Sequence, residues 1–281
     1  MEAVRRRAFE VAYRMLGSVA EAEDVAQEAM IRLTRAEQPI EEPAAWITTV
    51  ATRLSVDVLR LARVRRETYV GPWLPEPLVE DPGARVERAE TLSQAFLVVL
   101  ERLTPTERAA FLLREAFDYD YAAIAEVLGH SEASSRQLVS RARRRVDAGR
   151  PRFDADEAEG RALLERFLAA TEEGDLEALE RLLAEHAVMY ADGGGKATAA
   201  RRPVHGAARV ARALAAIARK QRGAEVELAT VNGRPGRILR APDRAVLDVL
   251  AIDVADGRIE AVRIVRNPDK LRHLDACARN Q

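Results

Sequence analysis

Arginine, serine and glutamine side chains are concentrated between residues 132 and 146. At helical spacing, Ala133, Leu138 and Ala142 form a narrow apolar stripe, and the polar residues cover the remaining surface. Arginine and glutamine can hydrogen-bond to base edges in a DNA major groove, and serine and arginine can bind phosphate. The pattern therefore indicates a DNA-reading helix, although a solvated surface helix would share its composition. The candidate readers are Ser134, Ser135, Arg136, Gln137, Ser140, Arg141, Arg143 and Arg144.

The segment before this helix has a complementary pattern. Residues 121–128 have a second apolar period, which ends in Gly129-His130-Ser131. A short helix, a glycine-containing turn and a serine that can cap the next helix are typical of a helix-turn-helix. Upstream, Thr104-Pro105-Thr106-Glu107 has the cap, first-turn proline and third-position glutamate that begin a helix. With a helix over 91–103, residues 91–150 are predicted to form a four-helix unit.

The net charge of −1 does not exclude nucleic acid, because the charges are clustered. Arginines are dense at residues 53–66 and again at 136–150, whereas acidic residues fill the segments between them. The single cysteine, Cys277, rules out an intramolecular disulfide, and the four histidines form no metal-binding motif. No apolar run approaches the roughly 20 residues that span a bilayer. We therefore expect the protein to bind no metal, cofactor or membrane. We expect it to be located in the reducing cytoplasm.

The N-terminal part is predicted to form a module of three amphipathic helices, over residues 6–16, 20–33 and 44–61. The second helix has an acidic outer face that includes Asp24, Gln27 and Glu28. In the third, the apolar positions Trp46, Ile47, Val50, Leu54, Val58 and Leu61 are predicted to face inward. The polar positions predicted to stay outside are Thr48, Thr49, Thr52, Arg53, Ser55, Asp57 and Arg60.

Two stretches of this module resemble region 2 of the extracytoplasmic-function sigma factors. The first is Ala12-Tyr13-Arg14-Met15-Leu16-Gly17-Ser18 followed by residues 22–33, and the second is Trp46 to Arg60. Residues 100–146, with Leu103-Thr104-Pro105-x-x-Arg108 leading into the helix-turn-helix, are similar to region 4 of the same family. Two ordered matches over about half the chain make the resemblance specific.

The resemblance implies partners and roles. Asp24, Gln27 and Glu28 would bind the β′ clamp helices of core RNA polymerase, whose β subunit is a further expected partner. Trp46, Thr49, Arg53, Asp57 and Arg60 would lie along the minus-ten promoter element, and the loop over 35–42 would hold a flipped base. The helix of residues 132–146 would read the minus-thirty-five element. One departure matters: many members have asparagine at the position of Arg53. For Trp46 the alternative is a packing role, because a tryptophan at the start of an amphipathic helix usually lies in the core.

A proline-rich linker, residues 68–90, joins the two modules. Three prolines and a glycine within residues 71–77 disfavour a helix and favour an extended chain. A simple tether would be polar, yet this one contains Tyr69, Val70, Trp73, Leu74 and Leu78. We expect it to dock on another surface; the alternative is a linker that packs loosely on neighbouring helices.

A third module is predicted over residues 154–274. Helical patterns over 160–172, 175–184 and 207–218 are followed by alternating strand patterns over 225–231, 238–239, 245–254 and 258–265, and 187–190 is a short apolar segment. This order resembles the α+β cone of SnoaL-like (NTF2-like) polyketide cyclases and ketosteroid isomerases, with a curved antiparallel sheet. The predicted fold class is thus two all-α modules, 1–67 and 91–150, followed by an α+β domain.

The resemblance raises the question of catalysis in the third module. The candidate proton-transfer residues are His186, Asp192, His205, Asp248 and Asp253, and their spacing gives no convincing acid and base arrangement. Fold similarity alone does not establish chemistry. We therefore expect no catalytic residues, and a regulatory or binding role for this module.

The combination of modules resembles the subgroup of extracytoplasmic sigma factors with a C-terminal extension, which regulates the sigma factor in cis. Three motifs carry this resemblance: Trp73-Leu74-Pro75-Glu76-Pro77, Asp192-Gly193-Gly194-Gly195-Lys196 and Asn267-Pro268-Asp269-Lys270-Leu271. We expect Lys196 to reach a carboxylate such as Glu76. The predicted regulatory residues are Trp73, Leu74, Pro75, Glu76, Asp192, Gly193, Lys196, Asn267, Asp269 and Lys270.

Two alternatives remain open at this point. The third module could bind or convert an apolar small molecule, which would make the protein bifunctional. The helix-turn-helix could instead belong to a regulator that binds duplex DNA without polymerase.

Overall fold

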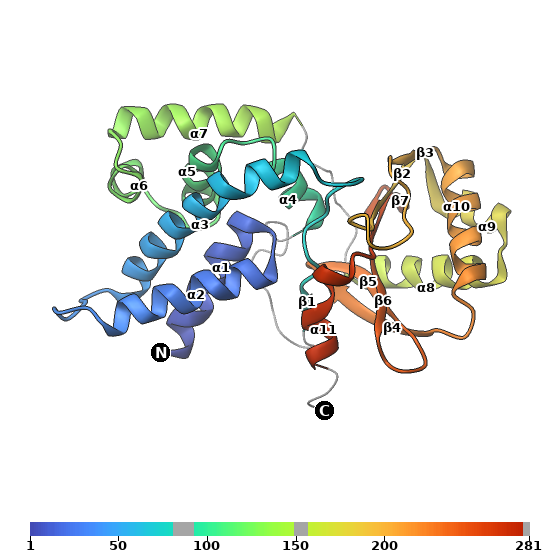
Figure 1. The fold of residues 1–281 in the computed structure, drawn as a ribbon. Helices are drawn as coiled ribbons and strands as arrows, with labels where there is room; N and C mark the ends of the chain where they lie inside the picture. Colours follow the sequence, from blue (N-terminus) through green and yellow to red (C-terminus); the bar gives the residue numbers. More distant parts are fainter. Residues whose placement is uncertain (81–92, 149–156, 278–281) are drawn as a thin grey trace. The chain divides into compact units, whose positions relative to one another are not determined.

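The computed structural model describes residues 1–80, 93–148 and 157–277, and Figure 1 shows its fold. The chain forms two compact units. The first comprises Met1–Thr68 and Phe96–Arg150, and the second comprises Tyr69–Ala95 and Pro151–Gln281. Residues 81–92, and with them most of the second half of the predicted linker, lie outside the described residues, as do the side chains of residues 62–67 in the first arginine cluster.

The N-terminal half of the first unit is a three-helix bundle of α1 (Glu2–Leu16), α2 (Val19–Thr34) and α3 (Pro43–Glu67). Gly17 ends α1 in the left-handed conformation, with φ of 66°, and Ser18 caps α2 by accepting a hydrogen bond from the Glu21 amide. The small residues Ala8, Ala12, Ala22 and Ala26 are fully buried, which lets α1 and α2 pack closely.

The remainder of the first unit contains α5 (Pro105–Glu115), α6 (Tyr121–Leu128), α7 (Glu132–Asp147) and most of α4 (Gln94–Leu100). Thr104 and Glu107 form the predicted capping box at the start of α5, and Ser131 caps α7. Gly129 provides the left-handed residue that ends α6, with φ of 68°. The predicted helix-turn-helix is confirmed.

The second unit contains a seven-stranded sheet in the order β1-β4-β5-β6-β7-β2-β3. The strands are β1 (Val79–Glu80), β2 (Leu183–Asp192), β3 (Val204–His205), β4 (Glu225–Val231), β5 (Arg234–Arg240), β6 (Val246–Ala255) and β7 (Arg258–Val265). The helices α8 (Glu157–Glu173), α9 (Leu176–Leu182) and α10 (Ala207–Lys220) lie on one side of the sheet (Figure 1). The short 3₁₀ helix η2 (Pro268–Lys270) and α11 (Arg272–Cys277) follow β7.

Alternation along the strands explains how the sheet builds its core. Leu250, Ile252 and Val254 of β6 belong to one buried cluster with residues of α8, α9 and α10. Val249 and Val265, which are paired across β6 and β7, have the opposite side-chain direction and are also buried. Both faces of the central strands are therefore covered.

The predicted fold class, helical modules followed by an α+β domain, is confirmed, with two corrections. The sheet is mixed, because β2 pairs with β7 in parallel, whereas an antiparallel sheet was predicted. The helix predicted to continue to Ala184 ends at Leu182, because Leu183, Ala187 and Met189 are buried along strand β2.

Candidate functional site

One side of the proposed DNA-reading helix α7 packs in the core of the helix-turn-helix and holds the helix in place. Leu138, Val139, Ala142 and Val146 are buried, and Leu138 and Val139 pack in the cluster that contains Ile124 of α6. The opposite face exposes Arg136, Gln137, Ser140, Arg141 and Arg144, which line a shallow surface depression. A row of cations with interspersed amide and hydroxyl groups has the chemistry of a DNA-binding face.

Ser135 is a correction to the predicted set of readers. Its side chain is 0% exposed, so it cannot reach DNA while α7 stays packed. Ala133, predicted in the apolar stripe, is exposed. Ser135 instead belongs to the buried side of α7, together with Leu138, Val139 and Ala142.

Several of the exposed arginines are already paired with acids. Arg136 forms an ion pair with Glu132 and lies over the ring of Tyr121, 4.6 Å from its centroid. Arg143 donates to Glu115 at 2.6 and 2.8 Å. Ion pairs with acidic residues therefore hold Arg136 and Arg143 in place on the surface of the first unit.

Glu107 connects the start of α5 to α7. Its carboxylate accepts from the Thr104 amide at 3.0 Å, and it also pairs with Arg145 and, at 3.5 Å, with Arg141. Burial alone would raise the pKa of Glu107. The hydrogen bonds from Thr104 and the charges of the two arginines lower it by more than burial raises it, so the pKa lies below its ordinary value of 4.5.

We expect Glu107→Gln to lower the free energy of unfolding of the first unit by about 1–3 kcal/mol at neutral pH. A depressed folded-state pKa contributes stability that is present above the unfolded value of 4.5 and is lost as the pH falls through the folded pKa. Urea unfolding of both proteins across acidic pH should therefore show a difference that narrows below pH 4.5. A pH-independent difference would contradict this role of the carboxylate.

Helix α3 is buried on more of its surface than its pattern predicted. Thr48, Thr52 and Ser55 are 0–1% exposed although they were predicted to lie outside, and Leu61, predicted inside, is 71% exposed. The hydroxyls of Thr48 and Ser55 donate to the carbonyls of Ala44 and Ala51. These internal bonds satisfy the hydroxyls, so small polar residues can face neighbouring helices.

The residues predicted for the minus-ten element fall into different environments. Arg53 donates from Nε to the Val127 carbonyl at 2.8 Å and from Nη2 to the Glu126 carbonyl at 3.0 Å. Because these carbonyls lie at the C-terminal end of α6, the guanidinium caps that helix. Asp57 and Arg60 pair with each other at 3.2 Å, and Trp46 and Thr49 are partly buried.

Arg108 forms a second link between the two halves of the first unit. It is 3% exposed, and it donates to the Met15 carbonyl at 2.7 Å, to the Leu100 carbonyl at 3.1 Å and to Glu101 at 2.6 Å. Burial lowers the pKa of Arg108 to about 9, which leaves the guanidinium charged at neutral pH. Arg108, the last residue of the motif Leu103-Thr104-Pro105-x-x-Arg108, thus anchors α5 to the end of α1.

The three residues predicted to bind polymerase lie on α2. Asp24 and Gln27 are exposed, and Glu28 is partly exposed and pairs with Arg32 at 2.8 Å. The acidic face is thus accessible on the first unit.

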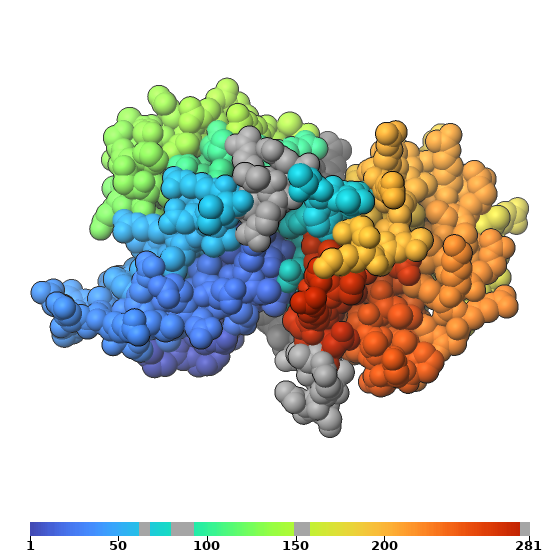
Figure 2. All heavy atoms as spheres, in the orientation of Figure 1, coloured from blue at the N-terminus to red at the C-terminus, as the bar shows by residue number. Residues whose placement is uncertain are grey.

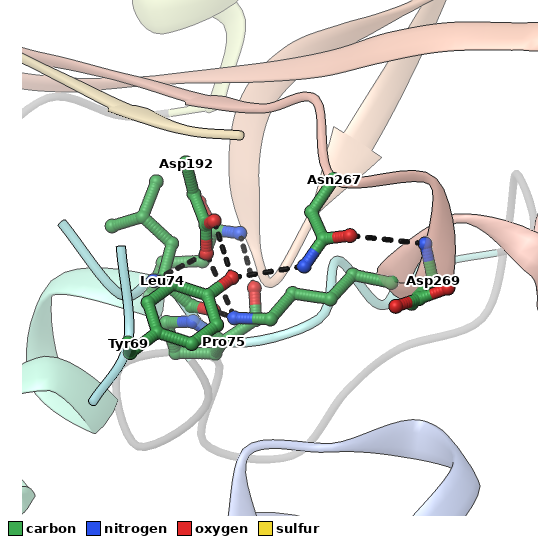
Figure 3. Close-up of polar contacts among 8 residues, drawn as sticks. Tyr69, Leu74, Pro75, Asp192, Asn267 and Asp269 are labelled. Carbon is green, nitrogen blue, oxygen red and sulfur yellow. Dashed lines mark hydrogen bonds and ion pairs between the residues drawn. The ribbon is translucent and has the colours of Figure 1, made fainter. Parts of the chain in front are cut away.

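Asp192 organises the contact between the first half of the linker and the α+β domain. It is 0% exposed and accepts from the Tyr69 hydroxyl at 2.6 Å, the Leu74 amide at 2.9 Å and Lys270 Nζ at 2.7 Å (Figure 3). The Lys270 ammonium also donates to the Leu74 carbonyl and lies 4.4 Å from the Trp73 ring centroid. Burial first, and then the Asp192 carboxylate, raise the pKa of Tyr69, so its hydroxyl remains a donor.

The glycine run and Asn267 complete this cluster. Asn267 donates from Nδ2 to the Tyr69 hydroxyl at 2.9 Å and accepts from the Asp269 amide at 3.1 Å. Gly194 has φ of 56°, and a Cβ there would lie 2.2 Å from Asn267 Nδ2. Only glycine therefore fits, both for the turn and for the close approach.

The predicted partner of Lys196 was wrong. Lys196 pairs with Asp269, which in turn pairs with Arg272 at 2.6 Å, whereas Glu76 is buried elsewhere in the linker at 9% exposure.

Two further predicted regulatory residues make backbone contacts. Gly193 is buried, and its carbonyl accepts from the Lys196 amide. The Pro75 carbonyl accepts from the Gln94 side chain at 3.2 Å.

The linker makes several contacts with the sheet that were not predicted from the sequence. Val79 and Glu80 form strand β1, which adds an edge to the sheet by pairing with β4. The side-chain oxygen of Asn232 accepts from the Leu78 backbone amide at 3.0 Å, and the backbone amide of Asn232 donates to the Leu78 carbonyl at 2.8 Å. An Asn-Gly pair between two strand patterns signals a hairpin turn, but nothing local indicates that it also binds the linker.

Four of the five candidate proton-transfer residues are engaged with partners of their own, and His205 is exposed on β3. Asp248 pairs with Arg237 at 2.6 Å and accepts from Gln221, Asp253 pairs with Arg263, and His186 lies 2.6 Å from Glu260. The described residues include no group of three or more His, Cys, Asp or Glu side chains that could hold a metal ion. None of the described helices is long and apolar enough to cross a membrane.

Comparison with known proteins defines the class to which this architecture belongs. Residues 1–65 match the model of sigma-70 region 2, and residues 93–146 match the model of sigma-70 region 4. The three-helix bundle and the helix-turn-helix are therefore the two promoter-related regions of a sigma factor.

The relatives make the assignment narrower. The chain is 42% identical to the extracytoplasmic-function (ECF) RNA polymerase sigma factor SigJ of Mycobacterium tuberculosis over 96% of this chain and 91% of that protein. It is 33% identical to the probable ECF sigma factor SigI of the same species, over 95% and 92% of the two chains. The crystal structure of SigJ matches with a TM-score of 0.78 and 38% identity, over 96% of both chains. The protein belongs to the ECF RNA polymerase sigma factors and acts in transcription initiation.

Proposed function

We propose that the second unit regulates this sigma factor in cis, and that it does so by binding the segment Tyr69–Glu80. The observation that supports the proposal is that the buried Asp192 carboxylate accepts hydrogen bonds from the Tyr69 hydroxyl and the Leu74 amide of the linker, and from Lys270. Tyr69 lies shortly after the region 2 match, residues 1–65, and α4 is the first helix of the region 4 match, residues 93–146. Whatever fixes this segment limits the positions that the two promoter-reading modules can take. The covalent connection gives the interaction a high effective concentration.

The two modules themselves take the roles expected for their residues. Arg136, Gln137, Ser140, Arg141 and Arg144 would contact the minus-thirty-five element, with Ser134 and Arg143 beside them. The acidic face of α2 would bind the polymerase clamp. Arg53 would act at the minus-ten element with its remaining donors, or with all of them after leaving the α6 carbonyls that its Nε and Nη2 bind.

We further propose that the second unit performs no catalysis. A proton-transfer residue needs a lone pair or a proton that a substrate can reach. Asp192, Asp248 and Asp253 are each paired with a buried or nearly buried cation. This arrangement favours regulation over the alternative of a small-molecule enzyme.

Run-off transcription with purified core polymerase tests the regulatory proposal. Deletion of residues 154–281 should change promoter output relative to the intact protein, and Trp73→Ala should reproduce part of that change, because it removes the ring that faces Lys270. Trp46→Ala, in region 2, provides a contrast that affects promoter reading without touching the linker. Unchanged output from both the deletion and Trp73→Ala would refute regulation through the linker.

A further inference from the structure

The outer face of α10 has a charge pattern that the regulatory proposal does not use. From Gly193 to Ala224 the sequence contains eight Lys and Arg residues and no Asp or Glu. Within this stretch, α10 exposes Arg209, Arg212, Arg219 and Lys220, and Arg222 follows the helix. Together these five residues are called the α10 basic face.

Helical geometry places these cations in one row. At 3.6 residues per turn, Arg209, Arg212, Arg219 and Lys220 fall within an arc of about 100°, over a length of roughly 16 Å. The buried residues Val210, Ala211, Leu214 and Ala215 occupy the opposite side. The core contact thus fixes the direction of the row, and the orange region of Figure 2 shows this part of the domain at the surface.

The neighbouring helices lack this segregation. On α8 and α9, Arg161 pairs with Glu165 at 3.4 Å and Arg181 with Glu177 at 3.7 Å. No ion pair joins any cation of the α10 basic face to an acid among the described residues, and no acid lies on α10 itself. A row of like charges without acidic partners creates a positive potential that attracts a polyanion.

We propose that the α10 basic face binds the phosphate backbone of duplex DNA between the two promoter elements. The second unit includes Tyr69–Ala95, the chain segment between region 2 and region 4. The chain thus tethers the domain to both modules, so DNA bound by these modules is a polyanion at high effective concentration for the α10 basic face. Four arginines and one lysine without nearby aromatic residues suit phosphate contacts, which are independent of sequence.

The test compares two matched triple variants of the full chain. One is Arg209→Gln/Arg212→Gln/Arg219→Gln on α10, and the control is Arg161→Gln/Arg166→Gln/Arg181→Gln on α8 and α9. Both remove three exposed cations from the same unit. Binding to a labelled random-sequence duplex is measured at several salt concentrations, and binding to core polymerase is measured in parallel.

The plot of log affinity against log salt has a negative slope, and each lost phosphate contact reduces the magnitude of this slope by about 0.9. We expect the α10 variant to reduce this magnitude by about 2 to 3, while the control keeps the slope of the intact protein and both retain polymerase affinity. An unchanged slope in the α10 variant, or an equal drop in the control, would overturn the proposal. Loss of polymerase affinity with an unchanged DNA slope would also overturn it, and would identify an acidic protein surface as the partner.

Discussion

Replacement of Asp192 by alanine is expected to lower the free energy of unfolding of the second unit by about 3–5 kcal/mol, because it leaves the buried Lys270 ammonium without the carboxylate that neutralises it. The same change removes the acceptor of the Tyr69 hydroxyl and of the Leu74 amide. Urea unfolding followed by circular dichroism measures the loss. Since Lys270 is only 7% exposed, water cannot readily replace the carboxylate.

Two companion variants separate this effect from the loss of any carboxylate. Glu180→Ala removes an exposed carboxylate from α9 and should change stability by less than about 0.5 kcal/mol. Asp192→Ala/Lys270→Met removes both charges and should recover part of the loss, because no charge remains buried alone. Equal losses for Asp192→Ala and Glu180→Ala would show that the cluster contributes nothing.

Replacement of Arg108 by alanine is expected to lower the free energy of unfolding of the first unit by a similar amount, about 3–5 kcal/mol. The variant leaves the buried carbonyls of Met15 and Leu100 without their donor and opens a cavity beneath α5. Because Arg108 joins the end of α1 to α5, we also expect faster amide exchange in both helices. Thermal unfolding and hydrogen exchange measure the two effects.

Arg6→Ala is the matched control for Arg108. Arg6 is 79% exposed and its ion pair with Glu10 spans 3.6 Å, so its loss should cost no more than about 1 kcal/mol. Arg108→Lys keeps the charge but has no planar fork to reach three acceptors, and it should fall between the two. A stable Arg108→Ala protein with unchanged exchange would show that the link between the two regions lies elsewhere.

The helices that carry the DNA-reading residues were predictable because their signals are local. The Thr104 and Glu107 capping box, the Ser131 cap and Gly129 all lie within four residues of a helix boundary and define α5, α6 and α7. Periodicity was less reliable where a helix packs on more than one side. Thr48 and Ser55 read as surface residues, yet they are buried because their hydroxyls bond to the preceding turn.

Contacts between distant segments could not be predicted in detail. The three linker-associated motifs were identified through resemblance, but the partner of Lys196 was assigned to the wrong carboxylate. Leu78 and Asn232 lie 154 positions apart, and Tyr69 and Asn267 lie 198 apart. The parallel pairing of β2 with β7 and the addition of β1 to the sheet likewise depend on the tertiary arrangement. Local patterns contain no information about such pairings.

The central claim is that the second unit holds the linker in the free protein, and amide hydrogen exchange at Leu74 and Leu78 tests it most directly. Both amides donate to buried side chains of the second unit, Asp192 and Asn232. The account predicts that they exchange as slowly as the amides of β5 and β6, and that Asp192→Ala accelerates exchange at Leu74. Exchange of both amides at the rate of an unstructured peptide in the intact protein would contradict the account.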